Sequence, residues 1–535
     1  MTITELQQQY AVHPNVTAMN RLLKDVSVKH IFCGGLCASS ASLFFSVLVR
    51  KETCPFVFIL SDLEEAGYFY HDLTQVLGGE RILFFPSSFR RAIKYGQKDA
   101  ANEILRTEVL SRLQKGEKGL CVVTYPDALA EKVVSRKELS DKTLKLGVGE
   151  RVDSTFVTDV LHSYGFEYVD YVYEPGQYAV RGSIIDVFSF SSEYPYRIDF
   201  FGDEVESIRT FEVDSQLSRE KKDSIVIVPD LAVTGMASTS FLDFIPRDAV
   251  LAMRDFLWLR ERIQSVHDEA LTPQAIAVQE AEENGGITLE GKLIDGSEFT
   301  VHALDFRRLE FGNKPTGTAD ATVSFDVTAQ PIFHKNFDLA AASFQEYQEK
   351  GYSLYICSDS TKQTDRIRAI FEDRGDKISF IAVERTLHEG FADNELRLCV
   401  FTDHQLFDRF HKYNLKSDKA RSGKVALSLK ELNQFTPGDY VVHTDHGVGR
   451  FSGLVRIPNG DTTQEVMKLV YQNDDVVFVS IHSLHKVSKY KGKEGEPPRL
   501  NKLGTGAWEK LKERTKTKIK DIARDLIKLY SQRRE

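Results

Sequence analysis

Short apolar runs alternate with amphipathic segments over the first 148 residues of this 535-residue chain. The apolar runs cover residues 29–33, 55–60, 81–85 and 119–124, and helical spacing of apolar residues is clearest at 64–77 and 100–114. Strands buried on both faces read as continuous apolar runs, and their alternation with helices is typical of parallel βαβ units. We therefore expect residues 1–148 to form an α/β domain.

The pattern changes at residue 149, where shorter strands with alternating apolar and polar residues begin. The runs YAVRGSIIDVFSF and YPYRIDFFGDEVESIRTFEVDS predict a small α+β domain inserted at 149–236. Residues 237–332 read as mixed helix and loop and are expected to complete the first module. Strand and helix patterns alternate again at 333–416, which predicts a second, smaller α/β domain.

A polar and charged segment separates these domains from the C-terminal part of the chain. We interpret residues 417–434 as a linker. Close β segments joined by glycine and Asn-Asp turns then predict a small β-barrel at 435–495. Residues 496–535 are expected to form a short linker and one long amphipathic helix, whose pattern still continues at residue 535, so we expect a further domain to follow.

Composition limits the class of protein. The chain is 42% hydrophobic and 27% charged, which is ordinary for a soluble globular protein of about three to five domains. Six cysteines in so long a chain favour free thiols in a reducing cytoplasm over a disulfide framework. No signal peptide and no apolar run near 18 residues is present, so we expect a cytoplasmic protein without a membrane partner.

Charge is distributed unevenly along the chain. The formal net charge is −9, which argues against a surface coated by nucleic acid. From Lys486 onward, however, sixteen lysines and arginines oppose seven acidic residues. The basic end could contact phosphates, and the sequence leaves open whether it touches DNA.

The segment GGLCASSAS, residues 34–42, lies between a predicted strand and a predicted helix, as a phosphate-binding loop does. In GxxxxGK[ST], a lysine reaches the outer phosphates and a hydroxyl holds magnesium. Aligned on Gly35, the second glycine is Ser40, the lysine is Ala41, and only the hydroxyl is retained, as Ser42. We interpret the segment as a degenerate loop that does not bind ATP; a plain turn of small residues is the alternative.

Other polar groups do not form a convincing catalytic set. His443 and His446, which flank Asp445, could suggest a metal or acid–base site, but no third ligand lies near outside this turn, so we interpret HTDH as a hydrogen-bonded turn. The acids of EEAGYFYHD, Glu64 to Asp72, are interpreted as a solvated helix face. We therefore assign no catalytic residue, no metal site and no cofactor to these 535 residues.

Two longer motifs carry a family resemblance. RGSIIDVFSFSSEYPYRIDFFGDEVESI, residues 181–208, resembles a segment shared by the excision-repair protein UvrB and the N-terminal module of the transcription-repair coupling factors (Mfd family). PGDYVVHTDHGVGRFSGL, residues 437–454, resembles the RNA-polymerase-interacting domain of that family and of CarD proteins. The order of the segments resembles that of the transcription-repair coupling factors over essentially the whole chain. The resemblance implies a UvrB-like α/β module with an inserted UvrA-binding domain and a CarD/Tudor-like barrel.

The resemblance also implies a function. The chain would be an N-terminal adaptor that binds the β subunit of stalled RNA polymerase and recruits UvrA for nucleotide-excision repair. The full-length family is an ATP-dependent DNA translocase that displaces stalled polymerase. Its motor, with ATP and magnesium and most double-stranded DNA contacts, would follow residue 535, so no enzymatic activity is expected here.

Site residues follow from the same resemblance. The UvrA-facing residues would be Arg181, Arg197 and Phe201, and the polymerase-facing residues would be Ile457 with Arg456 beside it. Alternatively, the two arginines are strand-edge residues in weak surface pairs and Ile457 is an inward-facing core residue. Ser189 departs from the motif, which often has proline there.

Two other functions remain open at this stage. A UvrB-like nucleotide-dependent DNA-loading protein would bind ATP, against which the alanine at position 41 speaks. A CarD-like transcription regulator would bind polymerase but not UvrA. The sequence assigns no role to residues 333–416.

Overall fold

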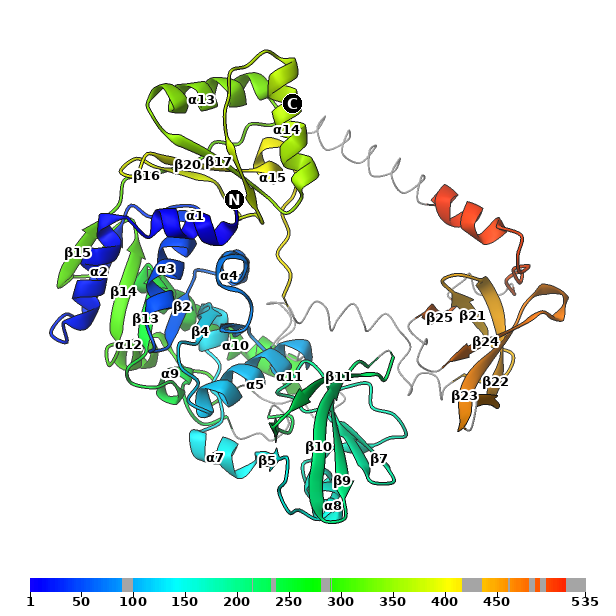
Figure 1. Ribbon diagram of the computed structural model, residues 1–535. Coiled ribbons are helices and arrows are strands. Elements are labelled where there is room, and N and C mark those ends of the chain that lie inside the picture. Colours follow the sequence, from blue (N-terminus) through cyan, green and yellow to red (C-terminus); the bar gives the residue numbers. More distant parts are fainter. Residues whose placement is uncertain are drawn as a thin grey trace. The chain divides into compact units, whose positions relative to one another are not determined.

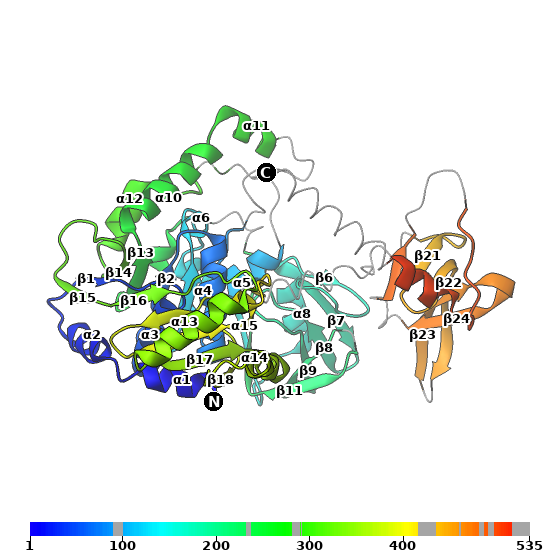
Figure 2. The same ribbon diagram turned by 90° about the horizontal axis from the view of Figure 1, so that it is seen from above.

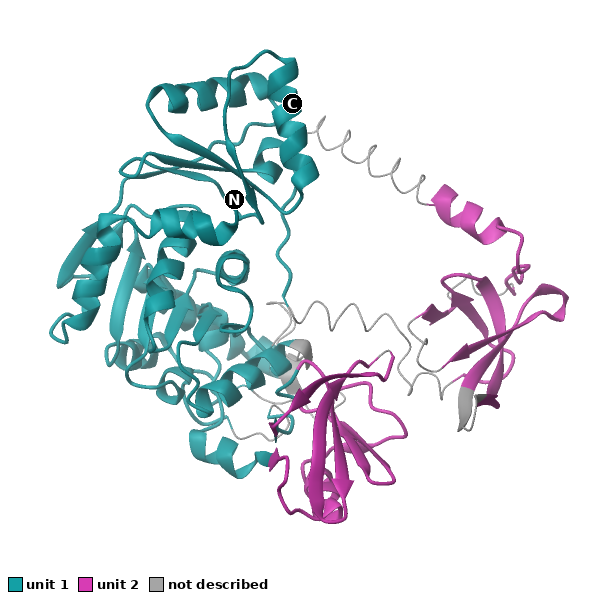
Figure 3. Ribbon diagram, viewed as in Figure 1, with its two compact units in different colours: residues 1–145, 190–192, 226–417 teal, residues 146–189, 193–225, 418–535 magenta. Residues whose placement is uncertain are grey.

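The structure is a computed structural model that describes residues 1–88, 100–213, 215–231, 237–280, 289, 291–415, 435–459, 462–480, 486–490 and 497–515. It divides into two compact units, drawn in teal and magenta in Figure 3. The first unit contains residues 1–145, 190–192 and 226–417, and the second contains 146–189, 193–225 and 418–535. The finer domain boundaries predicted above stay predictions, and the predicted linker at 417–434 lies outside the described residues.

A seven-stranded sheet forms the centre of the first unit (Figure 1). Its order is β15-β1-β14-β13-β2-β4-β3, and each pair of neighbouring strands is parallel. The strands are β1 (His30–Gly34), β2 (Phe56–Ile59), β3 (Ile82–Phe84), β4 (Cys121–Thr124), β13 (Val250–Arg254), β14 (Arg307–Gly312) and β15 (Ala321–Ser324). The prediction of a parallel α/β domain is confirmed. The interpretation of residues 237–332 as helix and loop was wrong, because they supply three strands of this sheet.

Helices cover the sheet. They are α1 (Ile3–Tyr10), α2 (Pro14–Lys24), α3 (Ser40–Lys51), α4 (Leu63–Leu77), α5 (Ala100–Gln114), α6 (Pro126–Leu129), α7 (Arg136–Asp141), α9 (Phe241–Phe244), α10 (Phe256–Ala270), α11 (Pro273–Glu280) and α12 (Gly296–Ala303). Residues 40–49 of α3 are all buried, so this helix lies inside the unit. Helices α10 and α12 pack side by side (Figure 2).

The first unit also contains the smaller α/β domain that the sequence predicts. Its sheet has the order β16-β19-β20-β17-β18 and mixes parallel with antiparallel pairs. The strands are β16 (Val327–Ala329), β17 (Ser353–Ser358), β18 (Ile381–Glu384), β19 (Phe391–Asp393) and β20 (Leu398–Thr402), and the helices are α13 (Phe337–Glu349), α14 (Thr361–Asp373) and α15 (Asp403–Leu406).

The inserted α+β domain contains a six-stranded sheet in the second unit, with the order β11-β10-β9-β8-β7-β6. Its elements are α8 (Ser154–Ser163), β6 (Glu167–Tyr168), β7 (Gln177–Arg181), β8 (Ile184–Val187), β9 (Tyr196–Phe201), β10 (Glu204–Phe211) and β11 (Ser218–Lys222). Strands β5 (Leu144–Gly147) and β12 (Ser224–Ile227) form a separate two-stranded sheet. Strands β7 to β11 are joined by antiparallel pairs, as alternating apolar and polar residues predict.

The C-terminal sheet has five antiparallel strands among the described residues, in the order β24-β23-β22-β21-β25. They are β21 (Tyr440–His443), β22 (Gly447–Asn459), β23 (Thr462–Val470), β24 (Val476–Ser480) and β25 (Val487–Lys489), with the 3-10 turn η1 (Gln472–Asp474) between β23 and β24. Residues 507–515 are helical, and the rest of the predicted C-terminal helix lies outside the described residues. Across the described ranges, no helix combines the length and the apolar character needed to cross a membrane.

Candidate functional site

The turn between β1 and α3 holds the degenerate loop. Gly35 has φ +86°, and a Cβ at this position would lie 2.0 Å from the carbonyl oxygen of Phe325, so only glycine fits. The Ser40 hydroxyl closes the turn by donating to the Cys37 carbonyl at 2.5 Å. Ala41, at the lysine position, is only 5% exposed. A side chain there points into packed protein, so the geometry is that of a structural turn.

A buried carboxylate, Asp72 of α4, faces the start of α3. It accepts hydrogen bonds from the hydroxyls of Ser39 at 2.7 Å and Ser42 at 2.8 Å, and from the backbone amide of His388 at 2.8 Å. Burial raises the pKa of Asp72, but hydrogen bonds from His71, Ser39 and Ser42 outweigh burial and leave the pKa below its usual range. The hydroxyl that would hold magnesium is therefore committed to an internal anion, which would repel a phosphate.

The smaller α/β domain contributes the remaining partners of this turn. The backbone amide of Glu389 donates to the Ser39 hydroxyl at 2.9 Å, and the amide of Ser39 donates to the Glu389 carbonyl at 3.3 Å. These bonds use groups that a phosphate loop directs at its ligand. The expectation that Asp72 lies on a solvated helix face was wrong, because the side chain is buried at this contact. The absence of ATP binding itself stays a prediction.

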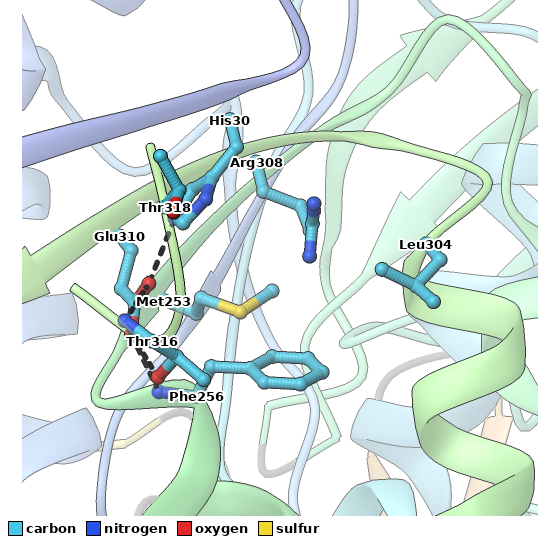
Figure 4. A pocket seen from close by; sticks show the side chains of 8 residues that line it. All are labelled: His30, Met253, Phe256, Leu304, Arg308, Glu310, Thr316 and Thr318. Carbon is cyan, nitrogen blue, oxygen red and sulfur yellow. Dashed lines mark hydrogen bonds and ion pairs between the residues drawn. The ribbon is translucent and has the colours of Figure 1, made fainter. Parts of the chain in front are cut away.

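A pocket of about 280 Å³ lies between the large sheet and helices α10 and α12 (Figure 4). Its carboxylate, Glu310, accepts from the amides of Phe256 and Thr316 and lies 2.8 Å from Nε2 of His30. Burial alone would raise the pKa of Glu310. The hydrogen bonds outweigh the effect of burial, so the pKa lies below its usual value. In Figure 4 the guanidinium of Arg308 lies between Met253 and Leu304 in projection. Because its carboxylate is fully hydrogen-bonded inside the protein, we interpret the pocket as part of the packing of this unit.

Two predicted interface residues of the insert share one buried carboxylate. The carboxylate of Asp186, whose side chain is 1% exposed, accepts hydrogen bonds from Nε of Arg197 at 2.8 Å and from its Nη2 at 3.0 Å. Arg181 also pairs with Asp186, and its guanidinium carbon lies 5.3 Å from the centre of the Tyr171 ring. The side chain of Arg197 is only 13% exposed, whereas that of Arg181 is 39% exposed. Arg197 is therefore held inside the domain, and Arg181 reaches the surface.

Phe201 lies at the same end of the insert sheet as Arg181. Ile184 of β8 pairs with Arg181 on one side and with Asp199 on the other, and Phe201 follows Asp199 on β9. Side chains two residues apart on a strand share a face, so Arg197 and Phe201 point to the same side. Phe201 is 77% exposed. The structure thus brings the three predicted residues together on one face, with Phe201 and Arg181 accessible.

The predicted polymerase-facing residues lie on the long strand β22. Arg456 is exposed and Ile457 is half-buried. Strand β21 pairs only with residues 447–450 of β22, whereas β23 pairs with β22 as far as Asn459. Within the described pairs, the other backbone edge of residues 454–459 is therefore available. Other exposed apolar side chains of this sheet are Leu454 on β22 and Val476 and Phe478 on β24.

The HTDH segment forms the turn between β21 and β22. The amide of Asp445 donates to Nδ1 of His443 at 3.1 Å, and the two histidine rings stack with centroids 4.6 Å apart. Nε1 of Trp508 donates to the carbonyl of Thr444 at 2.8 Å, which ties the following helix to the turn. These contacts agree with the interpretation of HTDH as a hydrogen-bonded turn.

Comparison with known proteins identifies both regions. Residues 144–232 match the family model "UvrB interaction domain", and residues 435–491 match "CarD-like/TRCF RID domain". The chain is 24% identical, over 95% of its length, to the transcription-repair-coupling factor of Bacillus subtilis strain 168. It is 24% identical, over 93% of its length, to that of Staphylococcus aureus strain USA300.

The chain spans about half the length of these curated relatives, 49% and 48% respectively. The resemblance inferred from the two sequence motifs is confirmed. The chain is similar, over nearly its whole length, to the N-terminal half of the transcription-repair-coupling factors, with their UvrB interaction domain and their RNA polymerase interaction (RID) domain.

Proposed function

We propose that this chain is the N-terminal adaptor part of a transcription-repair coupling factor. It binds the β subunit of stalled RNA polymerase through residues 435–491 and recruits UvrA through residues 144–232. The observation that carries this proposal is that one chain contains both family domains within a single match to these factors. A cytoplasmic location follows from this function.

The exposed end of the insert sheet supports a protein interface there. An exposed aromatic beside a partly exposed arginine is the chemistry enriched among binding hot spots, because the ring supplies apolar area and the guanidinium supplies directed donors. Phe201 and Arg181 provide these two groups. Arg197 has a different role in this proposal: it holds Asp186 in place, and Asp186 in turn orients Arg181.

Residues 454–459 of β22 have one edge that no described strand pairs with, which supports a polymerase contact by strand addition. A partner strand gains backbone hydrogen bonds at such an edge, so a small domain can bind with modest buried area. Arg456 and Ile457 lie on this stretch. Exposed Leu454, on the same strand, adds apolar area.

We assign no ATP hydrolysis to these 535 residues. The degenerate loop has alanine in place of lysine, and its hydroxyls bind Asp72. In this proposal, the translocase chemistry with ATP and magnesium, and most contacts to double-stranded DNA, belong to the part of the relatives that the chain does not span.

The test is calorimetric titration of the chain with purified UvrA. Wild type is expected to bind, and Phe201→Ala and Arg181→Ala are each expected to weaken binding about tenfold or more. Phe156→Ala on α8 is the matched control, because it removes another exposed aromatic, 56% accessible, from the same domain. If the wild-type chain binds polymerase but not UvrA, the adaptor proposal is wrong and a CarD-like regulator is favoured.

A further inference from the structure

Three histidines of the smaller α/β domain gather beside the degenerate loop. His388 lies between β18 and β19, His404 lies in α15, and His411 follows that helix. One ring nitrogen from each lies within 4.8 Å of those of the others. The Nδ1 atoms of His388 and His411 are 3.0 Å apart. Two imidazoles bound to one tetrahedral zinc ion place their nitrogens about 3.3 Å apart, so this spacing suits shared coordination.

The Nε2 atoms of His404 and His388 have partners of the kind found around metal sites. Nε2 of His404 lies 2.6 Å from the backbone carbonyl of His388 and donates to it. This bond places the proton of His404 on Nε2 and the lone pair on Nδ1, which lies 3.7 Å from a carboxylate oxygen of Asp403. Nε2 of His388 lies 3.5 Å from a carboxylate oxygen of Glu389. Carbonyl and carboxylate partners of this type orient histidine ligands and make them more basic.

The surrounding charges also favour a cation. Asp72, which contributes electrostatically to both rings, and Glu389 supply negative charge nearby.

We propose that His388, His404 and His411 together bind one divalent transition-metal ion, with zinc as the best match to three imidazoles. A fourth position would be left for water, as in three-ligand zinc sites. The rings of His404 and His411 are stacked, with centroids 4.1 Å apart and planes 13° apart. One of them turns about its side-chain torsions to direct its lone pair at the ion.

The consequence of binding is a clamp between two parts of the first unit. Tyr68 of α4 stacks on His388 with ring centroids 3.4 Å apart, and its hydroxyl donates to the carbonyl of His411 at 2.5 Å. An ion held by the three histidines therefore ties two segments of the smaller domain together at the point where both contact α4. This gives residues 333–416 a role in stabilising the closed, ligand-free form of the degenerate loop.

The sequence offers little signal for this site. The three histidines are 16 and 7 residues apart, which matches no common zinc-ligand spacing, and they come from a loop, a short helix and an extended segment. Only the fold brings them together.

The test begins with the full chain stripped of metal by a chelator and then titrated with zinc against a chromophoric competitor. Wild type is expected to bind one ion, and the triple variant His388→Ala, His404→Ala, His411→Ala is expected to lose this binding at least hundredfold. His334→Ala is the control, because this histidine belongs to the same domain and its side chain is 76% exposed. Zinc should raise the melting temperature of wild type and of the control but not that of the triple variant.

A second measurement needs no variant and so does not depend on whether the triple variant folds. X-ray absorption of the zinc-loaded wild type is expected to show imidazole nitrogen as the main first-shell ligand, with no sulfur. Equal zinc binding by wild type and the folded triple variant, a sulfur-containing shell, or an absence of stoichiometric binding would each overturn the proposal. Loss of zinc binding with UvrA binding intact would separate this site from the adaptor function.

Discussion

The degenerate loop and the end of the insert sheet each contain a buried carboxylate, and the two use it in opposite ways. Asp72 accepts from two serine hydroxyls and a backbone amide inside the protein, and it lies 3.4 Å from Nδ1 of the largely buried His71 ring. Asp186 instead binds two arginines, of which Arg197 is enclosed and Arg181 reaches the surface at the same end of the sheet as exposed Phe201.

This difference separates a structural network from a candidate interface. When every hydrogen-bonding group around a buried charge is satisfied internally, the charge stabilises the fold and offers nothing to a ligand. When one partner extends to the surface, the same charge orients that partner for binding. Exposure of the partners, rather than the carboxylate itself, distinguishes the two regions.

The largest effect is expected for Arg197→Ala. The substitution leaves Asp186 as an enclosed carboxylate with only Arg181, and loss of one partner of a buried pair costs about 3–5 kcal/mol. Hydrogen exchange of the β7 to β10 peptides in the full chain should accelerate accordingly. Arg219→Ala, which breaks a solvent-screened pair with Glu212, is the control and should change the exchange of these peptides far less. Equal effects of Arg197→Ala and Arg219→Ala would show that the ion pairs of Asp186 do not stabilise the inserted domain.

Asp72→Ala tests the other half of the comparison. It removes the acceptor of the Ser39 and Ser42 hydroxyls and of the His388 amide, and each buried group left without a partner costs roughly 1–3 kcal/mol, partly recovered by relaxation. We expect a loss of about 2–4 kcal/mol in unfolding free energy, with faster hydrogen exchange at residues 386–390. Glu64→Ala, on the exposed side of the same helix, should change stability by less than about 0.5 kcal/mol. If Asp72→Ala matched this control, the network would not stabilise the loop.

Ile457→Ala extends the comparison to β22. If its side chain and the adjacent free edge contact polymerase, binding to the β subunit should weaken about tenfold, or about 1.4 kcal/mol. Surface plasmon resonance with the isolated β subunit measures this change. Val476→Ala, 39% exposed on β24, is the control. Weakening by the control alone would place the contact on β24 instead.

The smallest effect is expected from nucleotide. Because Ala41 is buried and Ser42 binds Asp72, about 1 mM Mg-ATP should leave the melting temperature unchanged, whereas a ligand at one hundred times its Kd stabilises by about 2.7 kcal/mol. Differential scanning fluorimetry with and without Mg-ATP decides this. A clear upward shift would favour the UvrB-like alternative.

Much of the first sheet was predictable because several of its strands are plain apolar runs, as at residues 56–59 and 121–124. Strand β14 was missed because its sequence, RRLEFG, carries three charges, and the burial of Glu310 depends on hydrogen bonds from distant segments. Asp72 was misplaced although it follows Phe69 and Tyr68 by three and four residues, which puts it on the apolar side of α4.

The candidate interface was predictable only in part. The motif identified Arg181, Arg197 and Phe201, but it did not separate the enclosed arginine from the accessible one. That distinction depends on Asp186, which pairs across the strands with Arg197. A cross-strand partner is set by register, and register is not visible in a single sequence.

Assembly of the chain with UvrA and RNA polymerase tests the adaptor most directly. Light scattering after size-exclusion chromatography of the three-component mixture is predicted to reveal one complex that contains the chain, UvrA and polymerase. Phe201→Ala should remove only UvrA from it, and Ile457→Ala should reduce only polymerase. If UvrA and polymerase cannot bind the chain at the same time, or if neither binds it, the chain does not bridge them. Either result would contradict the adaptor account.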